Sequence, residues 1–226
     1  MYINTTGIVL REVTYTDSSK ILTLLTASEG KLTVSAHGAH RKNSKLAAVT
    51  GLLVFSEMTL MKKKDRWTMT EARSVEQFIG LRDDLTLLAL GTYIAELTEA
   101  VADEDSPNPE LLPLCLNALY ALSEKIKMPE YVKPAFELRL MAISGFKPIL
   151  NDKNKRENNS LEDGTMNLGT SALNAAKYIL NCEAKKLFSF TLSPEALKEL
   201  AQSTERYLLA HLDRQFRTLD YYHKIR

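Results

Sequence analysis

The sequence predicts an α+β protein in which short strands fill residues 1–80 and helices fill residues 81–226. Two observations support this division. Before Gly80, short runs rich in β-branched residues alternate with polar turn signals, as strands do. After Gly80, apolar residues recur at three-to-four spacing, which is the period of helices. The composition, 45% hydrophobic and 25% charged, is ordinary for a folded protein and excludes a chain that is disordered throughout.

Five strands are expected in the N-terminal part, at residues 6–16, 21–25, 32–36, 52–61 and 67–75. The connection between the third and fourth strands is longer than the others. Five short strands with one longer connection are typical of a small Greek-key barrel of the oligonucleotide-binding (OB) type. A small sandwich or an SH3-like barrel would give the same strand count, so both remain alternatives at this point.

Helices are expected over residues 85–101, 110–127, 130–144 and 170–182, followed by a last helix that begins after Ser193-Pro194. That last helix carries an apolar face through Leu212, with Arg214 and Arg217 in its final turns, where cations oppose the helix dipole. The segment 151–167 is strongly polar and is predicted to be an exposed loop.

The charge distribution is uneven although the net charge is only +1. Residues 1–80 hold 11 basic and 7 acidic side chains, a balance of +4, whereas residues 81–226 hold 18 and 21, a balance of −3. Residues 30–56 contain no carboxylate at all. The candidate contacts for a polyanion are the cations of this stretch and of the next turn: Lys31, Arg41, Lys42, Lys45, Lys62, Lys63, Lys64 and Arg66.

Trp67 follows this basic turn directly and has two possible roles. In a nucleic-acid reader it would be a stacking platform beside a phosphate grip, because aromatic rings stack on bases. Alternatively, the lysines form a solvated hairpin that discourages edge pairing, and Trp67 packs inside the barrel.

Several functions lack sequence support. The chain has no GxxxxGK[ST] or GxGxxG motif, and its two cysteines and four histidines show no metal-ligand spacing. We therefore expect no enzyme activity, no catalytic residue and no bound metal. No apolar run reaches the length of a membrane span, and the N-terminus lacks the pattern of a secretory signal, so we expect a cytoplasmic protein.

The order of several short strings resembles the bacterial RecO recombination mediators. In chain order these strings are TGIVLR (6–11), DSSKIL (17–22), EGK (29–31), AHGAHRKNS (36–44), YIAEL (93–97), AFELRL (135–140), GFKP (145–148) and RYLLAHL (206–212). No single string is diagnostic, but together they cover nearly the whole chain in the right order.

The resemblance implies an N-terminal OB barrel, a C-terminal helical domain and a non-enzymatic role in recombination repair. Members of such a family bind single- and double-stranded DNA, anneal complementary strands and help RecA replace single-strand DNA-binding protein, usually together with RecR. The family's basic stretch falls here on Arg41, Lys42 and Lys45. Such a protein would work on the nucleoid.

The resemblance also implies a site on the helical domain for the acidic, aromatic-ended tail of single-strand DNA-binding protein. The residues that match this region are Tyr93, Leu97, Lys133, Phe136 and Arg139. Many family members hold a structural zinc with four cysteines after the Gly-aromatic-x-Pro stretch, but residues 151–167 contain none, so zinc is not expected. A competing hypothesis is a protein-interaction scaffold whose barrel binds acidic proteins.

Overall fold

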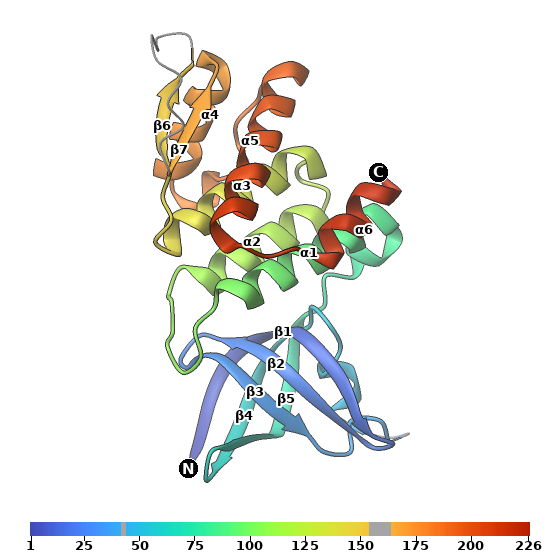
Figure 1. Ribbon diagram of the computed structural model, residues 1–226. Coiled ribbons are helices and arrows are strands. Elements are labelled where there is room, and N and C mark those ends of the chain that lie inside the picture. Colours follow the sequence, from blue (N-terminus) through green and yellow to red (C-terminus); the bar gives the residue numbers. More distant parts are fainter. Residues whose placement is uncertain (42–43, 154–163) are drawn as a thin grey trace.

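The five N-terminal strands form a closed barrel in the order β1-β2-β3-β5-β4, as shown by a computed structural model that describes residues 1–41, 44–153 and 164–226 (Figure 1). The strands are β1 (Tyr2–Thr16), β2 (Ser19–Thr26), β3 (Gly30–Ala36), β4 (Phe55–Lys63) and β5 (Arg66–Glu76). Antiparallel ladders join all neighbours except β3 and β5, which close the barrel through two parallel pairs. The predicted OB-type barrel is confirmed.

Side chains that alternate along the strands fill the barrel interior. Val9, Leu22, Leu24, Val34 and Leu60 are all fully buried there. The same alternation sends other barrel residues outward against the helices, including Ile8 and Leu25. β1 can serve both cores because it is long and carries a register shift between Val9 and Arg11.

Six α-helices follow the barrel within the described residues, and the helical C-terminal domain is also confirmed. They are α1 (Leu85–Val101), α2 (Leu111–Ser123), α3 (Pro129–Ile143), α4 (Thr170–Asn181), α5 (Pro194–Leu212) and α6 (Arg217–Ile225). Asp84 caps α1 by accepting hydrogen bonds from the backbone N–H groups of Thr86 and Leu87, which lowers the pKa of its carboxyl group. Ser193 caps α5 and Pro194 occupies its first turn, as predicted.

The last predicted helix is in fact two helices. α5 ends at Leu212, because Asp213 adopts a left-handed conformation with φ of 42°. The chain then turns, and α6 packs back against α1, where Thr218 donates its backbone N–H and its hydroxyl to the Glu96 carboxylate. Arg214 therefore lies between the helices and Arg217 begins α6, so placing both in the last turns of one helix was wrong.

The predicted loop over residues 151–167 also needs correction at both ends. β6 (Ile149–Asp152) pairs in parallel with β7 (Thr165–Leu168), with Asn151 opposite Asn167. Residues 154–163, the centre of that prediction, lie outside the described part of the chain.

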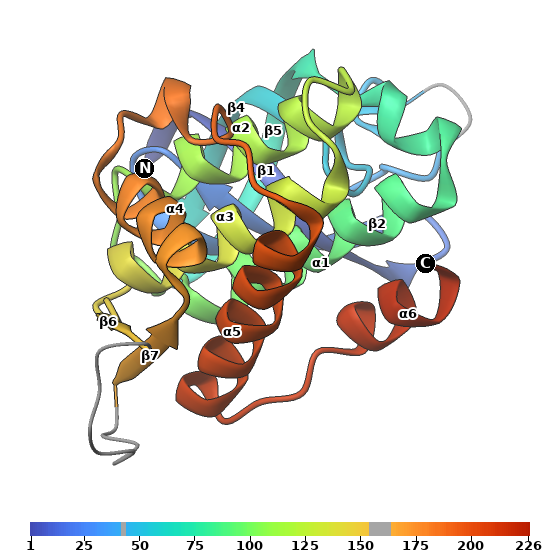
Figure 2. The same ribbon diagram turned by 90° about the horizontal axis from the view of Figure 1, so that it is seen from above.

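The helices cover one end of the barrel, as the two views show (Figures 1 and 2). Leu53 and Leu81 approach Gly91 of α1 closely, within 3.2 Å of where a Cβ atom would lie. Arg11 of β1 adds an ion pair to Glu99 at 3.0 Å. The opposite end of the barrel, at the bottom of Figure 1, is left uncovered by the helices and carries the N-terminus and the β4–β5 turn.

Candidate nucleic-acid interface

The β4–β5 turn presents a row of cations at the uncovered end of the barrel. Lys63 and Arg66 are opposite each other in the ladder, and Lys64 makes the turn with a left-handed φ of 54°. All three side chains are exposed, whereas Lys62 is half-buried with its Nζ 5.0 Å from the centre of the Trp67 ring. A tight two-residue turn thus displays the cations outward.

The loop after β3 holds further cations at the same end. Gly38, with φ of 73°, makes a turn in which the Arg41 N–H donates to the Gly38 carbonyl oxygen at 3.0 Å. Ala39 is buried in the barrel core together with Trp67, which anchors the loop beneath this end of the barrel. Arg41 and Lys45 are exposed on it. Lys42 lies outside the described residues.

The cations of this end are free of carboxylate partners within the described ranges. We call Arg41, Lys45, Lys62, Lys63, Lys64 and Arg66 the cationic end of the barrel. Every ion pair between described residues lies elsewhere, for example Arg73 with Glu57 and Lys20 with Glu12. Asp17 and Asp65 are the carboxylates of the two adjacent turns. These side chains can therefore pair with an external anion without first breaking an ion pair.

Trp67 does not have the open ring face that a stacking platform needs. Its side chain is only 5% exposed and belongs to the barrel core, with Lys62 covering the ring. The packing alternative is correct, because strand alternation turns Trp67 inward between the outward-facing Arg66 and the half-exposed Thr68.

Lys31 lies apart from the cationic end. Its Nζ donates to the Glu99 carbonyl oxygen at 3.3 Å, and its backbone N–H donates to that of Asp103 at 3.1 Å. This residue is the second of β3, at the end of the barrel that faces the helices, so it joins the two parts of the chain. The sequence-based grouping of Lys31 with the other cations was wrong. Residues that are close in the sequence can lie at opposite ends of a strand, and therefore at opposite ends of the barrel.

The residues predicted to hold a partner's tail are largely buried. Tyr93, Leu97 and Phe136 are completely buried in the helical core, and Lys133 is 4% exposed. Lys133 also has its charge satisfied, because its Nζ lies 2.6 Å from a carboxylate oxygen of Glu137 and from one of Glu205. The predicted group therefore does not form an open tail site.

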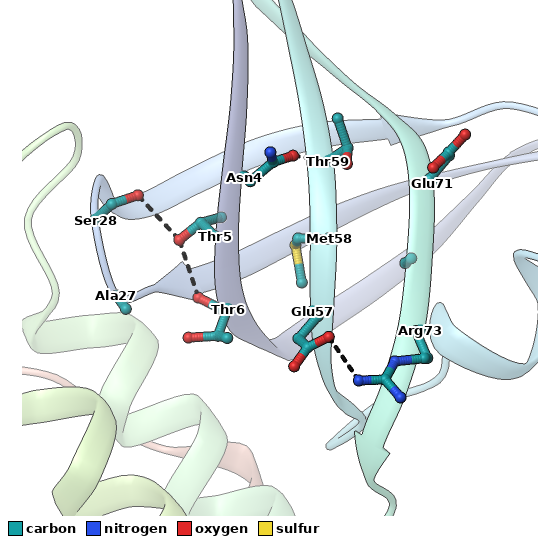
Figure 3. A pocket seen from close by; sticks show the side chains of 11 residues that line it. Asn4, Thr5, Thr6, Ala27, Ser28, Glu57, Met58, Thr59, Glu71 and Arg73 are labelled. Atoms are coloured by element: carbon teal, nitrogen blue, oxygen red, sulfur yellow. Dashed lines mark hydrogen bonds and ion pairs between the residues drawn. The ribbon is translucent and has the colours of Figure 1, made fainter.

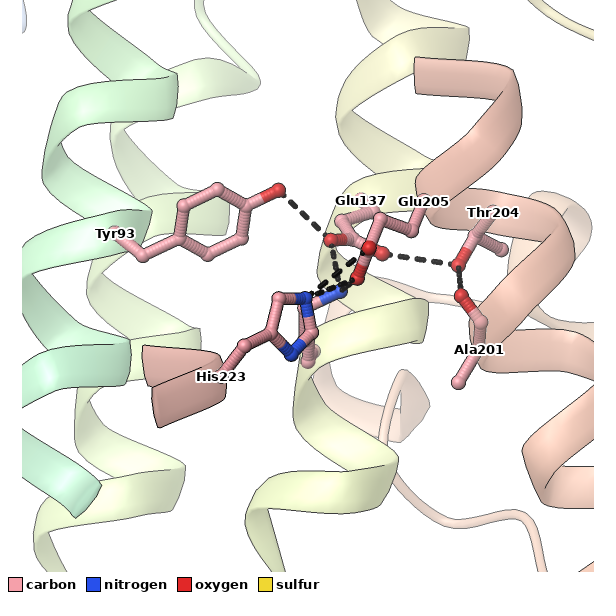
Figure 4. Close-up of polar contacts among 7 residues, drawn as sticks. Tyr93, Glu137, Ala201, Thr204, Glu205 and His223 are labelled. Atoms are coloured by element: carbon pink, nitrogen blue, oxygen red, sulfur yellow. Dashed lines mark hydrogen bonds and ion pairs between the residues drawn. The ribbon is translucent and has the colours of Figure 1, made fainter. Parts of the chain in front are cut away.

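Tyr93 and Lys133 instead belong to a buried polar network between α1, α3, α5 and α6 (Figure 4). Glu137 accepts hydrogen bonds from the Tyr93 hydroxyl at 2.8 Å and from the Thr204 hydroxyl at 2.9 Å. His223 of α6 lies 3.0 Å from Glu205. Burial and the nearby Glu137 raise the pKa of the Tyr93 hydroxyl, so Tyr93 remains a hydrogen-bond donor. Burial alone would lower the pKa of Lys133, but Glu137 and Glu205 raise it overall, which keeps Lys133 charged.

Two of the tail candidates line pockets. Lys133, whose charge is already paired, lines one of about 610 Å³, and Arg139 lines a smaller one. The Nη2 of Arg139 donates to the Cys182 carbonyl oxygen at 2.5 Å, while its buried Nε has no hydrogen-bond partner among the described residues. The adjoining pocket has a volume of about 160 Å³. Apart from Arg139 and Glu110, its lining is apolar and includes Pro109, Pro113 and Leu187.

A larger groove of about 740 Å³ crosses the outer face of β1, β4 and β5 (Figure 3). Hydroxyl groups line one side of it, where Ser28 donates to the Thr5 hydroxyl at 2.9 Å. The Glu57–Arg73 pair, at 2.9 Å, occupies the other side (Figure 3). Since its one arginine is already paired, this groove lacks the free positive charge of the cationic end.

Sequence analysis missed two exposed aromatic residues near the cationic end. Tyr2 is 66% exposed and Tyr15 is 70% exposed, and both lie on β1. Each tyrosine lies at an end of β1, next to a turn or loop that carries cations. That position is the signal from which they could have been predicted.

No group of three or more His, Cys, Asp or Glu side chains among the described residues could hold a metal ion. None of the helices over the same residues is both long enough and apolar enough to span a membrane.

The fold and the site define a class of protein: an OB-type barrel with a cationic end, covered at its other end by a helical domain. Comparison with known families specifies the class further. The family described as Recombination protein O N terminal matches residues 1–78, and Recombination protein O C terminal matches residues 82–220. The chain belongs to the RecO family.

Individual relatives agree with this assignment over most of the chain. The DNA repair protein RecO of Acetivibrio thermocellus is 30% identical, with 97% of this chain and 96% of the relative covered. That of Symbiobacterium thermophilum is 28% identical, with 99% and 97% covered. The DNA repair protein RecO of Bacillus subtilis is 34% identical over 64% of this chain and 56% of its own length.

Proposed function

We propose that this protein is a mediator of recombination in DNA repair that binds single- and double-stranded DNA without sequence preference. In this role it anneals complementary strands and helps RecA load onto DNA coated by single-strand DNA-binding protein. The observation that carries the proposal is the cationic end of the barrel, whose side chains are exposed, apart from the half-buried Lys62, and free of carboxylate partners among the described residues. Membership of the RecO family supports the same role.

The chemistry of the cationic end fits backbone binding rather than base reading. Lysine and arginine side chains neutralise phosphates and release condensed counterions, and this interaction is the same for every sequence. Annealing needs both strands brought together without a preference for either, which such a surface supports. We propose no enzymatic step, because binding and charge neutralisation account for the role.

We further propose that the helical domain holds the acidic, aromatic-ended tail of single-strand DNA-binding protein, and that RecR is a second partner. Of the residues that matched the tail region, Arg139 adjoins a mainly apolar pocket that Glu110 also lines, and its buried Nε has no hydrogen-bond partner among the described residues. An apolar pocket with one guanidinium group suits an apolar side chain next to a carboxylate. Membership of the RecO family supports the proposal that RecR is a second partner.

We also propose that the chain works without a structural zinc, since the cysteines that hold it in many relatives are missing between residues 151 and 167. Elemental analysis of the purified protein is expected to find no stoichiometric zinc. One zinc per chain would refute this part of the proposal.

Strand annealing tests the proposed function. Two complementary oligonucleotides, each coated with single-strand DNA-binding protein, should anneal faster when the wild-type protein is added. The double variant Lys63→Glu/Lys64→Glu should lose most of this acceleration. Lys185→Glu/Lys186→Glu is the matched control, because it reverses two exposed lysines on the helical domain instead.

The competing scaffold hypothesis predicts a different result. A scaffold would not accelerate annealing as a pure protein, and its capture of partner proteins would survive nuclease treatment. These two results together would favour the scaffold hypothesis over the mediator hypothesis.

A further inference from the structure

We propose that Tyr2 and Tyr15 are base-stacking platforms that flank the cationic end of the barrel and let it hold single-stranded DNA more tightly than phosphate contacts alone. The inference rests on the proposed DNA binding and deepens it, because it names the form of DNA that this end would hold best. The sequence had pointed to Trp67 for this role, and the burial of Trp67 leaves the role open.

Tyr2 lies beside the β4–β5 turn. It is opposite Met61 in the β1–β4 ladder, and the backbones of Met1 and Lys62 are hydrogen-bonded in both directions at 2.9 and 3.2 Å. Paired residues point to the same face of a sheet, and so do residues two apart along a strand. Tyr2 therefore shares its face with Lys63, and Lys63 in turn is opposite Arg66. One exposed ring and two exposed cations thus project from one surface.

Tyr15 lies beside the loop that follows β3. Thr14 is opposite Lys20 and Thr16 is opposite Ser19, so Tyr15 is the extra residue of a β-bulge. Bulges redirect side chains, and here the ring is 70% exposed. The neighbouring Thr14 hydroxyl lies 3.2 Å from Nε2 of His40, the residue before Arg41. Asp17, in the next turn, is the acidic neighbour of this ring.

Each exposed tyrosine thus adjoins one of the two groups of cations, at the two ends of the same strand. Both ends of β1 lie at the uncovered bottom of the barrel in Figure 1. A positively charged surface with interleaved aromatic rings is the arrangement by which proteins hold single strands without sequence preference. Stacking needs unpaired bases, whereas phosphate contacts are available on duplex and single strands alike. The two rings would therefore favour single strands.

The test compares two single-stranded probes of the same length, fluorescein-labelled oligothymidine and a chain of abasic phosphodiesters. The variant Tyr2→Leu/Tyr15→Leu should bind oligothymidine about 25-fold or more weakly, since each of the two stacked bases contributes a factor of roughly five or more. Its affinity for the abasic chain should be unchanged. Tyr2→Phe/Tyr15→Phe should bind oligothymidine like the wild type, because phenylalanine keeps the ring.

Tyr120→Leu is the matched control, because Tyr120 is 48% exposed on α2, in the helical domain. It should leave both affinities unchanged. Equal oligothymidine binding by the leucine double variant and the wild type would overturn the stacking proposal, as would equal losses on both probes.

Charge reversal separates this proposal from the proposed function. Lys63→Glu/Lys64→Glu should weaken binding to both probes, since both carry phosphates. If it weakens neither, DNA binding by the cationic end fails. If the lysine variant binds both probes more weakly but Tyr2→Leu/Tyr15→Leu binds oligothymidine like the wild type, only the stacking proposal fails.

Discussion

Trp67 and Tyr15 carry aromatic rings in opposite surroundings, and burial decides what each can do. Trp67 is 5% exposed and packs in the barrel core, whereas Tyr15 is 70% exposed on a bulge. The same holds for the cations: Lys133 is buried between two carboxylates, whereas Lys64 is exposed in a turn and makes no described ion pair. Residue type alone could not separate these cases.

The first prediction concerns Trp67. Replacing it by alanine should lower the free energy of unfolding by about 3–5 kcal/mol, because a large buried ring leaves a cavity. Trp67→Phe should lose less of the free energy of unfolding, since the phenylalanine ring fills most of that space. Urea unfolding followed by circular dichroism measures both values. An alanine variant that is fully stable yet binds DNA poorly would contradict the packing role.

The second prediction concerns the pH dependence of the buried network. Burial would raise the pKa of Glu205, but Lys133 and His223 favour its charged form and lower the pKa below its usual 4.5. A group with a lowered pKa in the folded state contributes stability above its unfolded pKa, and this contribution is lost as the pH falls through the folded value. The wild type should therefore lose stability below pH 4.5 more steeply than Glu205→Gln.

Unfolding midpoints measured across a pH series check this prediction. Glu183→Gln is a suitable control, because Glu183 is exposed and its ion pair with Lys186 is long, at 3.7 Å. Its curve should follow the wild type. Parallel curves for Glu205→Gln and the wild type would show that the network adds nothing to acid sensitivity.

At the scale of elements, the short 3₁₀ helix η2 (Ile79–Asp83) links the barrel to α1. It packs tightly on the end of α2, because a Cβ atom at Gly80 would lie 2.2 Å from the Ser123 carbonyl oxygen. No such contact is possible in a packed protein, so this position requires glycine. The contact fixes how the chain enters the helical domain.

The third prediction follows from that contact. Gly80→Ala should destabilise the protein by about 1–3 kcal/mol, the usual cost of overpacking. Gly51→Ala is the matched control, since its Cβ would meet no atom closer than 3.5 Å. It should be neutral or stabilise by up to about 1 kcal/mol. Thermal unfolding of the two variants measures the difference, and equal midpoints would contradict the packing argument.

The elements that sequence predicted correctly have strong local signals. The β-branched run in β1 and the Ser193-Pro194 start of α5 are examples. The break between α5 and α6 was missed because Asp213 adopts the left-handed conformation without a glycine or proline to announce it. β6 and β7 were missed because each is only four residues long and adjoins a strongly polar stretch, although β7 does alternate between half-buried and buried residues.

At the scale of the whole molecule, the barrel has two functionally different ends. One end is closed by the helices through a core that includes Ile8 and Leu25, and the other carries the cationic end. The charge pattern of the sequence predicted most of the cations, but it could not assign Lys31 to the helical side. Nor could it show that the predicted tail residues were buried, since both facts depend on contacts between distant segments.

The central claim is that the cationic end binds the DNA backbone, and the salt dependence of single-strand binding tests it most directly. The logarithm of the association constant for oligothymidine should fall steeply with the logarithm of salt concentration, with a slope of about −0.7 per phosphate neutralised. Lys63→Glu/Lys64→Glu should make that slope clearly shallower, and Lys185→Glu/Lys186→Glu should leave it unchanged. A flat wild-type curve, or equal slopes for the wild type and the Lys63/Lys64 variant, would contradict the claim.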